Sequence, residues 1–253
     1  MNRNSRIMAL TVTLFAIAMG YLESSVVVYL REIYYPEGFD FPLKEMTGKI
    51  AATEILRELA TLIMLITLGY LTGKNKMQRF GIFIYAFGIW DIFYYIFLKL
   101  LLGWPESLFT RDILFLIPVT WVGPVLAPAI NALTMCVFGA LIFIYSEKDP
   151  RFRINWKEWS LLILGSLIII FSYTQDYLNY MQSRMPLVDL FKPSEADNVL
   201  LSATKYIPDK FNWWVFGIGQ LIIIYVIFLF SRDQRPVPPT RPRQTSEVQS
   251  EKF

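Results

Sequence analysis

The sequence predicts an all-α, polytopic integral membrane protein with six transmembrane helices and one extra short, broken or interfacial helix before the fourth span. Three observations predict this class. Of the 253 residues, 55% are hydrophobic and only 18% are charged, which is below the ~25% of an average soluble domain. The mean hydropathy is +0.41. Apolar runs of about 20 residues recur along the chain, and that is the length a helix needs to cross a bilayer.

The first three spans are expected near residues 7–30, 50–71 and 80–102. Ala16-Ile17-Ala18 has the form of a signal-peptidase site, but the apolar run continues to Leu30, which favours a retained span over a cleaved signal peptide. A polar loop with Pro36 and Pro42 separates the first two spans. Gly103-Trp104-Pro105 ends the third.

The region from 113 to 145 is too long for one simple helix and is interrupted by Pro118, Pro124 and Pro128. We predict residues 113–122 as a short half-helix, interfacial or re-entrant, and residues 125–145 as the fourth span. Broken backbone at membrane depth needs protein or a cavity to shield it. This region would therefore either cap a cavity or act as a kinked aromatic anchor.

The last two spans are expected at 159–174 and 213–230, joined by a long loop that is apolar enough to lie on the membrane surface. Residues 1–231 would form one six-helix membrane domain. Residues 232–253 are rich in Pro, Arg and Ser, which is typical of a disordered tail. Lys and Arg gather in the termini and in the short loops around 72–79 and 146–156, so the positive-inside rule places both termini in the cytoplasm. The expected location is the cell membrane, with bacterial cytoplasmic membrane as the preferred case.

Composition also excludes several kinds of site. The chain has no histidine and one cysteine, Cys136. No cofactor is evident: haem ligation by His, a zinc site built from Cys and His, and an iron–sulfur cluster all lack ligands. Cys136 lies in an apolar run and is expected to be a small core residue. The net charge of +3 comes with basic residues mainly in loops, so no nucleic-acid partner is indicated.

The candidate site is a set of charged residues inside the predicted spans, where ionisable groups are costly and usually functional. Glu54, Arg57, Glu58 and Thr61 fall on one stripe of the second helix. Glu23 of the first span and Asp91 of the third lie at a similar depth in the outer half. We expect the three helices to turn these faces toward one another. Further candidate cavity-lining residues are Tyr95, Asn131 and Gln220.

Charge balance suggests what such a site would hold. Glu23, Glu54, Glu58 and Asp91 oppose a single cation, Arg57, which can pair with two carboxylates. At least one carboxyl group is left over, and it is either protonated or holds a cation. If a metal binds, oxygen ligands from Glu54, Glu58 and Asp91 would suit a hard cation such as Na⁺, Mg²⁺, Ca²⁺ or Mn²⁺.

Three functional interpretations follow. The first is proton- or cation-linked transport or ligand binding, with a small ion or membrane-soluble molecule as partner. The second is a membrane enzyme in which Glu58 or Asp91 acts as general acid or base on a lipid-soluble substrate and Arg57 stabilises charge. The third is a structural or assembly subunit whose charged stripe meets a partner membrane subunit. The lipid bilayer is a partner in all three, and the same residues could also serve simply to lock helices together.

Overall fold

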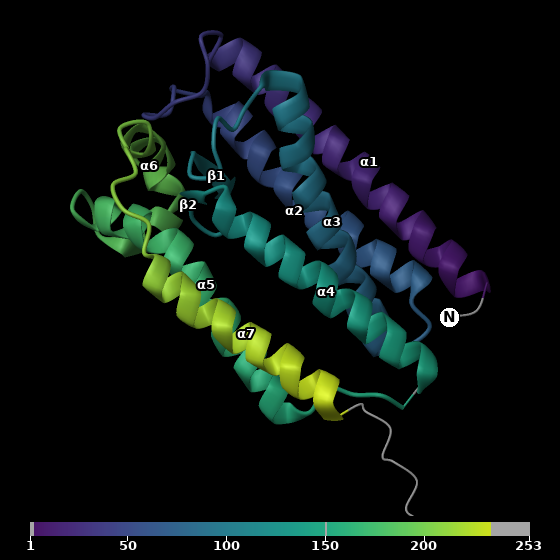
Figure 1. Ribbon diagram of the computed structural model, residues 1–253. Coiled ribbons are helices and arrows are strands. Elements are labelled where there is room, and N and C mark those ends of the chain that lie inside the picture. Colours follow the sequence, from purple (N-terminus) through teal and green to yellow (C-terminus); the bar gives the residue numbers. More distant parts are fainter. Residues whose placement is uncertain (1–2, 150, 234–253) are drawn as a thin grey trace, which may run out of the picture.

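The computed structural model describes residues 3–149 and 151–233, which form a bundle of helices with one small sheet (Figure 1). Within these residues, six helices are long and apolar enough to cross a membrane, so the chain is a multi-pass membrane protein, as predicted. Their bounds are Arg3–Tyr34 (α1), Gly48–Thr72 (α2), Lys76–Leu102 (α3), Leu126–Lys148 (α4), Trp156–Gln182 (α5) and Trp213–Asp233 (α7).

Each long helix extends beyond its predicted span at one or both ends. The largest difference is in α5, which continues to Gln182 although the prediction ended at 174. The Asp176 carboxylate lies in this extension and accepts hydrogen bonds from the Tyr206 hydroxyl (2.6 Å) and the Asp209 backbone N–H (3.2 Å). Because the Tyr206 hydroxyl and the Asp209 N–H donate to the Asp176 carboxylate, the helix can continue past this charged residue. At its start, Asn155 and Glu158 form a capping box.

The predicted half-helix at 113–122 is wrong. The chain there forms an antiparallel hairpin of β1 (Arg111–Phe115) and β2 (Trp121–Pro124), with Asp112 opposite Gly123. Pro118 interrupts any helix, and the flanking aromatic and β-branched residues favour strands. Strand pairing gives hydrogen-bond partners to backbone groups on the facing edges of β1 and β2, which a broken helix would have left open.

The segment after α5 carries short helices and no further span. It contains the 3₁₀ helices η1 (Leu187–Phe191) and η2 (Pro193–Glu195) and the helix α6 (Ala196–Ala203). Its exposed apolar side chains, which include Val188, Phe191 and Leu201, fit the predicted location at the membrane surface. The Arg111 guanidinium donates to the carbonyl oxygens of Pro208 and Asp209, which fixes the following loop against the hairpin.

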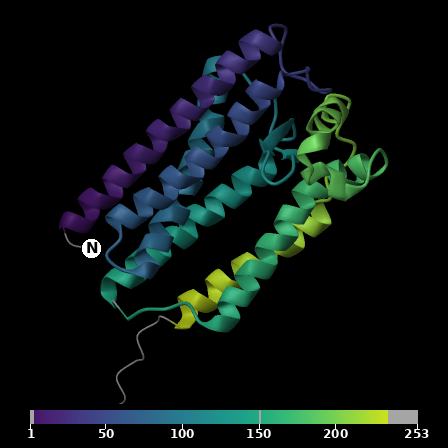
Figure 2. The ribbon, with the colours of Figure 1, turned by 180° about the vertical axis from the view of Figure 1, so that it is seen from behind.

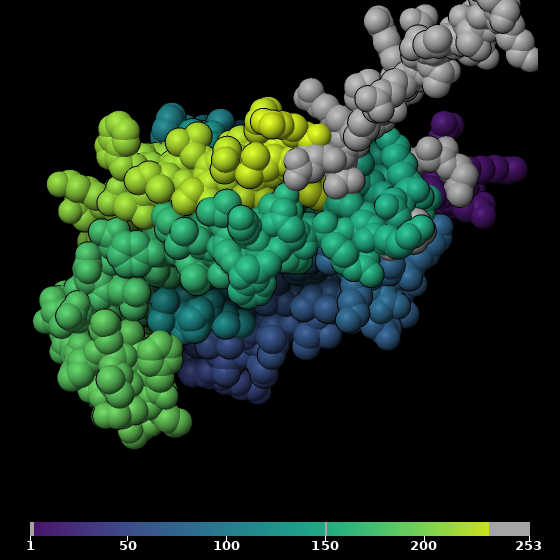
Figure 3. All heavy atoms as spheres, turned by 90° about the horizontal axis from the view of Figure 1, so that it is seen from below, coloured from purple at the N-terminus to yellow at the C-terminus, as the bar shows by residue number. Residues whose placement is uncertain are grey.

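The bundle has two distinguishable ends. The hairpin end contains β1, β2 and α6, and the terminal end is where α1 begins and α7 ends (Figures 1 and 2). α3 packs against α1, α2 and α4, while α5 pairs with α7. In Figure 3 the green segment around α6 projects from the bundle at the hairpin end. Arg232 and Asp233 belong to α7, and the rest of the predicted tail lies outside the described residues.

Close helix contacts at the terminal half depend on small residues. A Cβ added at Gly139 of α4 would lie 2.6 Å from the Gly81 carbonyl oxygen of α3, and one added at Gly219 of α7 would lie 2.8 Å from the Gly165 carbonyl oxygen of α5. Both distances are below contact distance, so these backbones touch only because side chains are missing. These two helix pairs, α3 with α4 and α5 with α7, are therefore closely packed.

Candidate functional site

The charged stripe of α2 faces the protein interior, as predicted. Glu58 and Thr61 are 7% and 5% exposed, and Leu65 is fully buried. The apolar residues on the remaining faces, such as Leu56 and Ile63, are exposed. The helix therefore turns its polar side inward and leaves its apolar side for lipid.

Arg57 holds two of the predicted carboxylates. Its Nε donates to Glu54 Oε2 at 2.8 Å on the same helix, and its Nη1 pairs with Glu23 Oε1 of α1. Thr61 Oγ1 lies 3.5 Å from the second Glu23 oxygen. One guanidinium thus joins α1 to α2 and neutralises one of two negative charges.

Glu58 makes a different connection. Both of its carboxylate oxygens accept from the backbone N–H of Leu116, at 3.1 and 2.9 Å. Leu116 follows directly after β1. The prediction placed Glu58 in the site but did not foresee this partner, because the hairpin was expected to be a helix. Glu58 therefore ties α2 to the hairpin.

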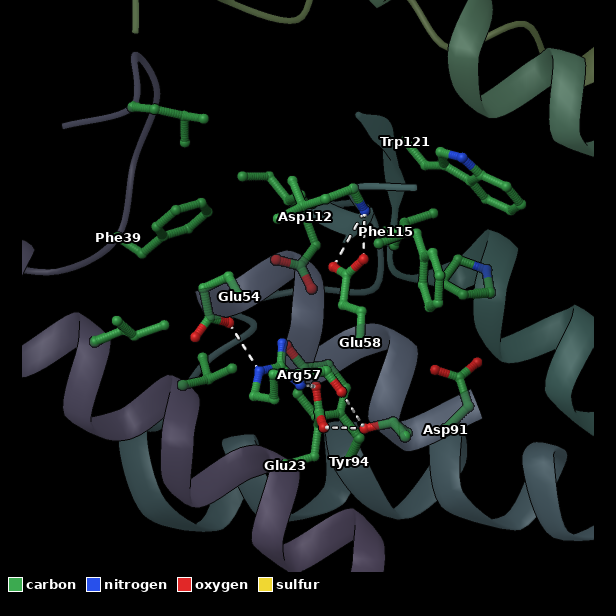
Figure 4. A pocket seen from close by; sticks show the side chains of 18 of the residues that line it. Glu23, Phe39, Glu54, Arg57, Glu58, Asp91, Tyr94, Asp112, Phe115 and Trp121 are labelled. Carbon is green, nitrogen blue, oxygen red and sulfur yellow. Dashed lines mark hydrogen bonds and ion pairs between the residues drawn. The ribbon is translucent and has the colours of Figure 1, made fainter. Parts of the chain in front are cut away.

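Asp91 stands apart from the other predicted carboxylates. It projects from α3 into the space between the helices and the hairpin, and no interaction is drawn to it in Figure 4. Within the described residues, its side chain makes no hydrogen bond or ion pair. It is half-buried, and it lines a cavity. Asp91 is thus the predicted carboxylate without a protein partner.

Sequence reasoning missed a second charged pair, Arg31 with Asp112. Arg31 is one residue beyond the predicted first span, and Asp112 precedes the predicted half-helix, so neither counted as an intramembrane charge. In the structure they are 8% and 3% exposed, and an Arg31 nitrogen lies 3.7 Å from Asp112 Oδ1. The only available signal was that both residues adjoin apolar runs.

Asp112 is a buried acid with two stabilising neighbours. The Tyr95 hydroxyl donates to Asp112 Oδ2 at 3.1 Å, and the Arg31 guanidinium lies on the other side. Burial raises the pKa of Asp112 to about 6, while Arg31 and the Tyr95 hydrogen bond act to lower it. Tyr95, predicted to line a cavity, therefore also orients this carboxylate.

The charged groups surround a cavity of about 370 Å³ at the hairpin half of the bundle. Its walls are largely apolar and aromatic, with contributions from Phe87, Trp90, Phe115, Trp121 and Tyr173. Near the hairpin end it is bordered by the exposed Lys44 and by Thr204 at the end of α6. All predicted site residues except Gln220 line it: Glu23, Glu54, Arg57, Glu58, Thr61, Asp91, Tyr95 and Asn131.

Two candidate lining residues have partners of their own. Asn131 Nδ2 donates to the Tyr173 hydroxyl at 2.8 Å, and both residues border the cavity. Gln220 lies elsewhere: it is buried on α7 and donates to Thr134 Oγ1 of α4 at 2.5 Å. Asn131 therefore belongs to the cavity wall, and Gln220 links two helices outside it.

The predicted metal set is not assembled. No group of three or more His, Cys, Asp or Glu side chains in the described chain is placed to hold a metal ion. Glu54 and Glu58 are engaged by Arg57 and Leu116, and Asp91 stands alone across the cavity (Figure 4). The arrangement instead offers one free carboxylate to a single positive or hydrogen-bond-donating group.

Comparison of this chain with protein-family models, with curated proteins and with solved structures finds no match.

Proposed function

We propose that this protein binds a small, largely apolar molecule with a cationic group in its cavity, as the loading step of proton- or cation-linked transport. The Asp91 carboxylate carries the proposal, because it borders the cavity and has no partner in the described chain. An ionisable group is costly at membrane depth unless something compensates its charge. A bound cation or a proton would do so.

The size and lining of the cavity support a small ligand. A volume of about 370 Å³ falls within the range of roughly 300–1,000 Å³ that is common for ligand pockets. Largely apolar walls that also present charged groups favour molecules that combine an apolar body with a charged end. Phe87 and Trp90 lie near Asp91 in sequence and also line the cavity, so they would contact the apolar body.

Access from one end supports transport. The cavity is bordered at the hairpin end by exposed residues such as Lys44, whereas in the terminal half α3 and α4 pack closely at Gly81 and Gly139. By the positive-inside rule, the distribution of Lys and Arg favours cytoplasmic termini. The cavity would then face outward and load from that side.

The alternatives fit less well. An assembly subunit would leave its charged stripe uncovered, but Glu58 and Thr61 are buried by the chain itself. A membrane enzyme needs a free general base, and both Glu58 oxygens are engaged by Leu116. Asp91 could still serve as an acid or base, so an enzymatic role would rest on that residue.

A binding experiment with matched probes tests the proposal. Purified protein in maltoside micelles is titrated with 2-phenylethylamine and with 2-phenylethanol, which differ chiefly in the cationic group, and binding is followed by tryptophan fluorescence. We expect the amine to bind at least about tenfold more tightly than the alcohol, as is usual for a charge-assisted hydrogen bond. This preference should disappear in Asp91→Asn and persist in Glu32→Gln, which removes an exposed acid outside the cavity. Equal binding of amine and alcohol to the native protein would refute the proposal.

A further inference from the structure

We infer that the ligand is a zwitterion, and that Arg31 receives its anionic group, a carboxylate or a phosphate. This inference rests on the proposed function, since it adds a second subsite to the cavity that contains Asp91. Arg31 lies in the last turn of α1 and borders the same cavity. It is more than nine-tenths buried, with 8% of its surface exposed.

The Arg31 guanidinium is held in position by aromatic rings. Its central carbon lies 3.7 Å from the centre of the Trp104 ring and 4.6 Å from that of Phe39. Stacking of this kind stabilises the cation through its flat face and leaves the N–H groups pointing outward from the edge. The cation is therefore oriented before any ligand arrives.

The N–H donors of Arg31 find an ion-pair partner but no hydrogen-bond acceptor among the described residues. In the part of the chain that the structure describes, the guanidinium makes no hydrogen bond. The nearest acid oxygen, Asp112 Oδ1, is 3.7 Å away, which is an ion-pair distance too long for a hydrogen bond. The other Asp112 oxygen is taken by the Tyr95 hydroxyl. The guanidinium therefore keeps N–H donors beyond its ion pair with Asp112 that an acceptor on a ligand in the cavity could receive.

A planar or tetrahedral oxyanion meets this requirement best. The guanidinium edge matches the two oxygens of a carboxylate or phosphate and can donate to both at once. The exposed Lys44, which also borders the cavity, adds positive charge on the same side. Arg31 and Lys44 together make this part of the cavity attractive to an anion.

The two subsites lie at different depths. Arg31 is three residues from the end of α1, and Asp91 is eleven residues from the end of α3, where both helices reach the hairpin end. At ~1.5 Å per residue, this difference of eight residues places Asp91 deeper by about 12 Å. The ligand would enter with its cationic group leading and keep its anionic group near the opening. Glu23, Glu54 and Glu58 are less available to the cation than Asp91, because Arg57 and the Leu116 N–H already contact them.

Matched probes separate the two charges of the ligand. The native protein in maltoside micelles is titrated with 8-aminooctanoate, with its methyl ester, which keeps only the cation, and with 4-aminobutanoate, in which the charges are closer. A second arm uses lysophosphatidylethanolamine and its N-acetylated form, which keeps only the anion. Preferential binding of the zwitterion in the first arm would indicate that the ligand is a free amino acid. The same preference in the second arm would indicate a lipid headgroup.

We expect the zwitterion of at least one arm to bind about tenfold to a hundredfold more tightly than its singly charged partner. In Arg31→Gln the advantage of 8-aminooctanoate over its ester should be lost, and Arg31→Lys should restore only part of it. Arg6→Gln, at the exposed start of the same helix, is the matched control and should keep the full advantage.

The outcomes distinguish this inference from the proposed function. If ester and acid bind equally to the native protein, and the N-acetylated lipid binds as well as the free amine, the zwitterion is refuted. That result stands even if Arg31→Gln fails to fold, because it needs only the native chain. If the ester still binds in an Asp91-dependent way, the proposed function survives. If no amine binds at all, both fail.

Discussion

The two halves of the bundle both contain buried polar groups but differ in how these are satisfied. At the terminal half, Glu147 of α4 accepts from Ser5, from Lys74 Nζ at 2.9 Å and from Gln78 Nε2 at 2.9 Å. At the hairpin half, Asp91 and the donors of Arg31 have no hydrogen-bond partner in the described chain. A satisfied network locks helices together, whereas open groups beside a cavity are available to a ligand. The contrast separates charges that the described chain satisfies from polar groups that are open to a ligand.

The face that α2 turns toward the protein interior changes in character along the helix. α2 touches α3 at Gly69, where an added Cβ would lie 2.6 Å from the Arg79 carbonyl oxygen. Eight to fifteen residues earlier, the same face of α2 carries Glu54, Arg57 and Thr61. These polar side chains line the cavity.

The largest effect on stability should come from Arg57→Gln. This change leaves the Glu23 and Glu54 carboxylates without their shared cation, and breaking a buried ion pair costs roughly 3–5 kcal/mol. Unfolding of the purified protein by SDS titration measures it. Asp91→Asn is the contrasting variant: it removes a group without a partner, so stability should be unchanged or higher. Equal losses of unfolding free energy in the two variants would contradict the distinction between charges that have protein partners and charges that have none.

Gly139→Ala tests the close contact of the terminal half. Its new methyl group would press on the Gly81 carbonyl and on Tyr85, and overpacking of this kind costs about 1–3 kcal/mol. Gly217→Ala is the matched control, because nothing lies within 4 Å of its added Cβ. Thermal unfolding of both variants gives the comparison. A loss at Gly217 as large as that at Gly139 would point to a general effect of alanine instead.

Glu147→Gln should lower stability by roughly 1–2 kcal/mol, because the amide loses the charge that pairs with Lys74 and accepts fewer hydrogen bonds. Binding of 2-phenylethylamine should stay within about twofold of the native value, which titration of the same preparation measures. If amine affinity falls as much as in Asp91→Asn, the terminal network takes part in binding and the division between the halves is wrong.

The smallest effect is a change in titration at Asp112. Burial raises the pKa of this carboxyl to about 6, so its native form holds a proton that the unfolded chain releases near pH 4. Its contribution to stability is present at low pH and is lost as pH rises through 6. An infrared carboxyl band that is missing in Asp112→Asn should titrate near pH 6. In Arg31→Gln the midpoint should rise, because a neighbouring cation is lost. A midpoint that stays in place would show that Arg31 does not stabilise the charge.

The spans and the inward face of α2 could be predicted because they depend on local pattern alone. Apolar runs determine which segments cross a bilayer, and the spacing of Glu54, Glu58 and Thr61 determines which side they share. The hairpin could not be predicted in this way. Pro118 within an apolar stretch is compatible with either a broken helix or a turn. The pairing of Asp112 with Gly123 depends on contacts with the rest of the fold, which local sequence pattern does not show.

The candidate site was predictable in part for the same reason. Glu23, Arg57 and Asp91 stood out because charges inside apolar spans are rare. Arg31 and Asp112 lie at the ends of predicted elements, where charges are common, so only three-dimensional contact with Trp104 and Tyr95 distinguishes them. The partner of Glu58 was likewise hidden, since Leu116 lies 58 residues away in sequence.

Photo-crosslinking with an alkylamine that carries a diazirine tests the central claim most directly. The protein in maltoside micelles is irradiated with this probe, and labelled peptides are located by mass spectrometry. The account predicts labels in the cavity-lining segments 87–95 and 128–135, reduced about tenfold in Asp91→Asn and unchanged in Glu32→Gln. Labels confined to outward-facing residues such as Leu100 and Leu221, or labelling of the cavity that does not depend on Asp91, would contradict it.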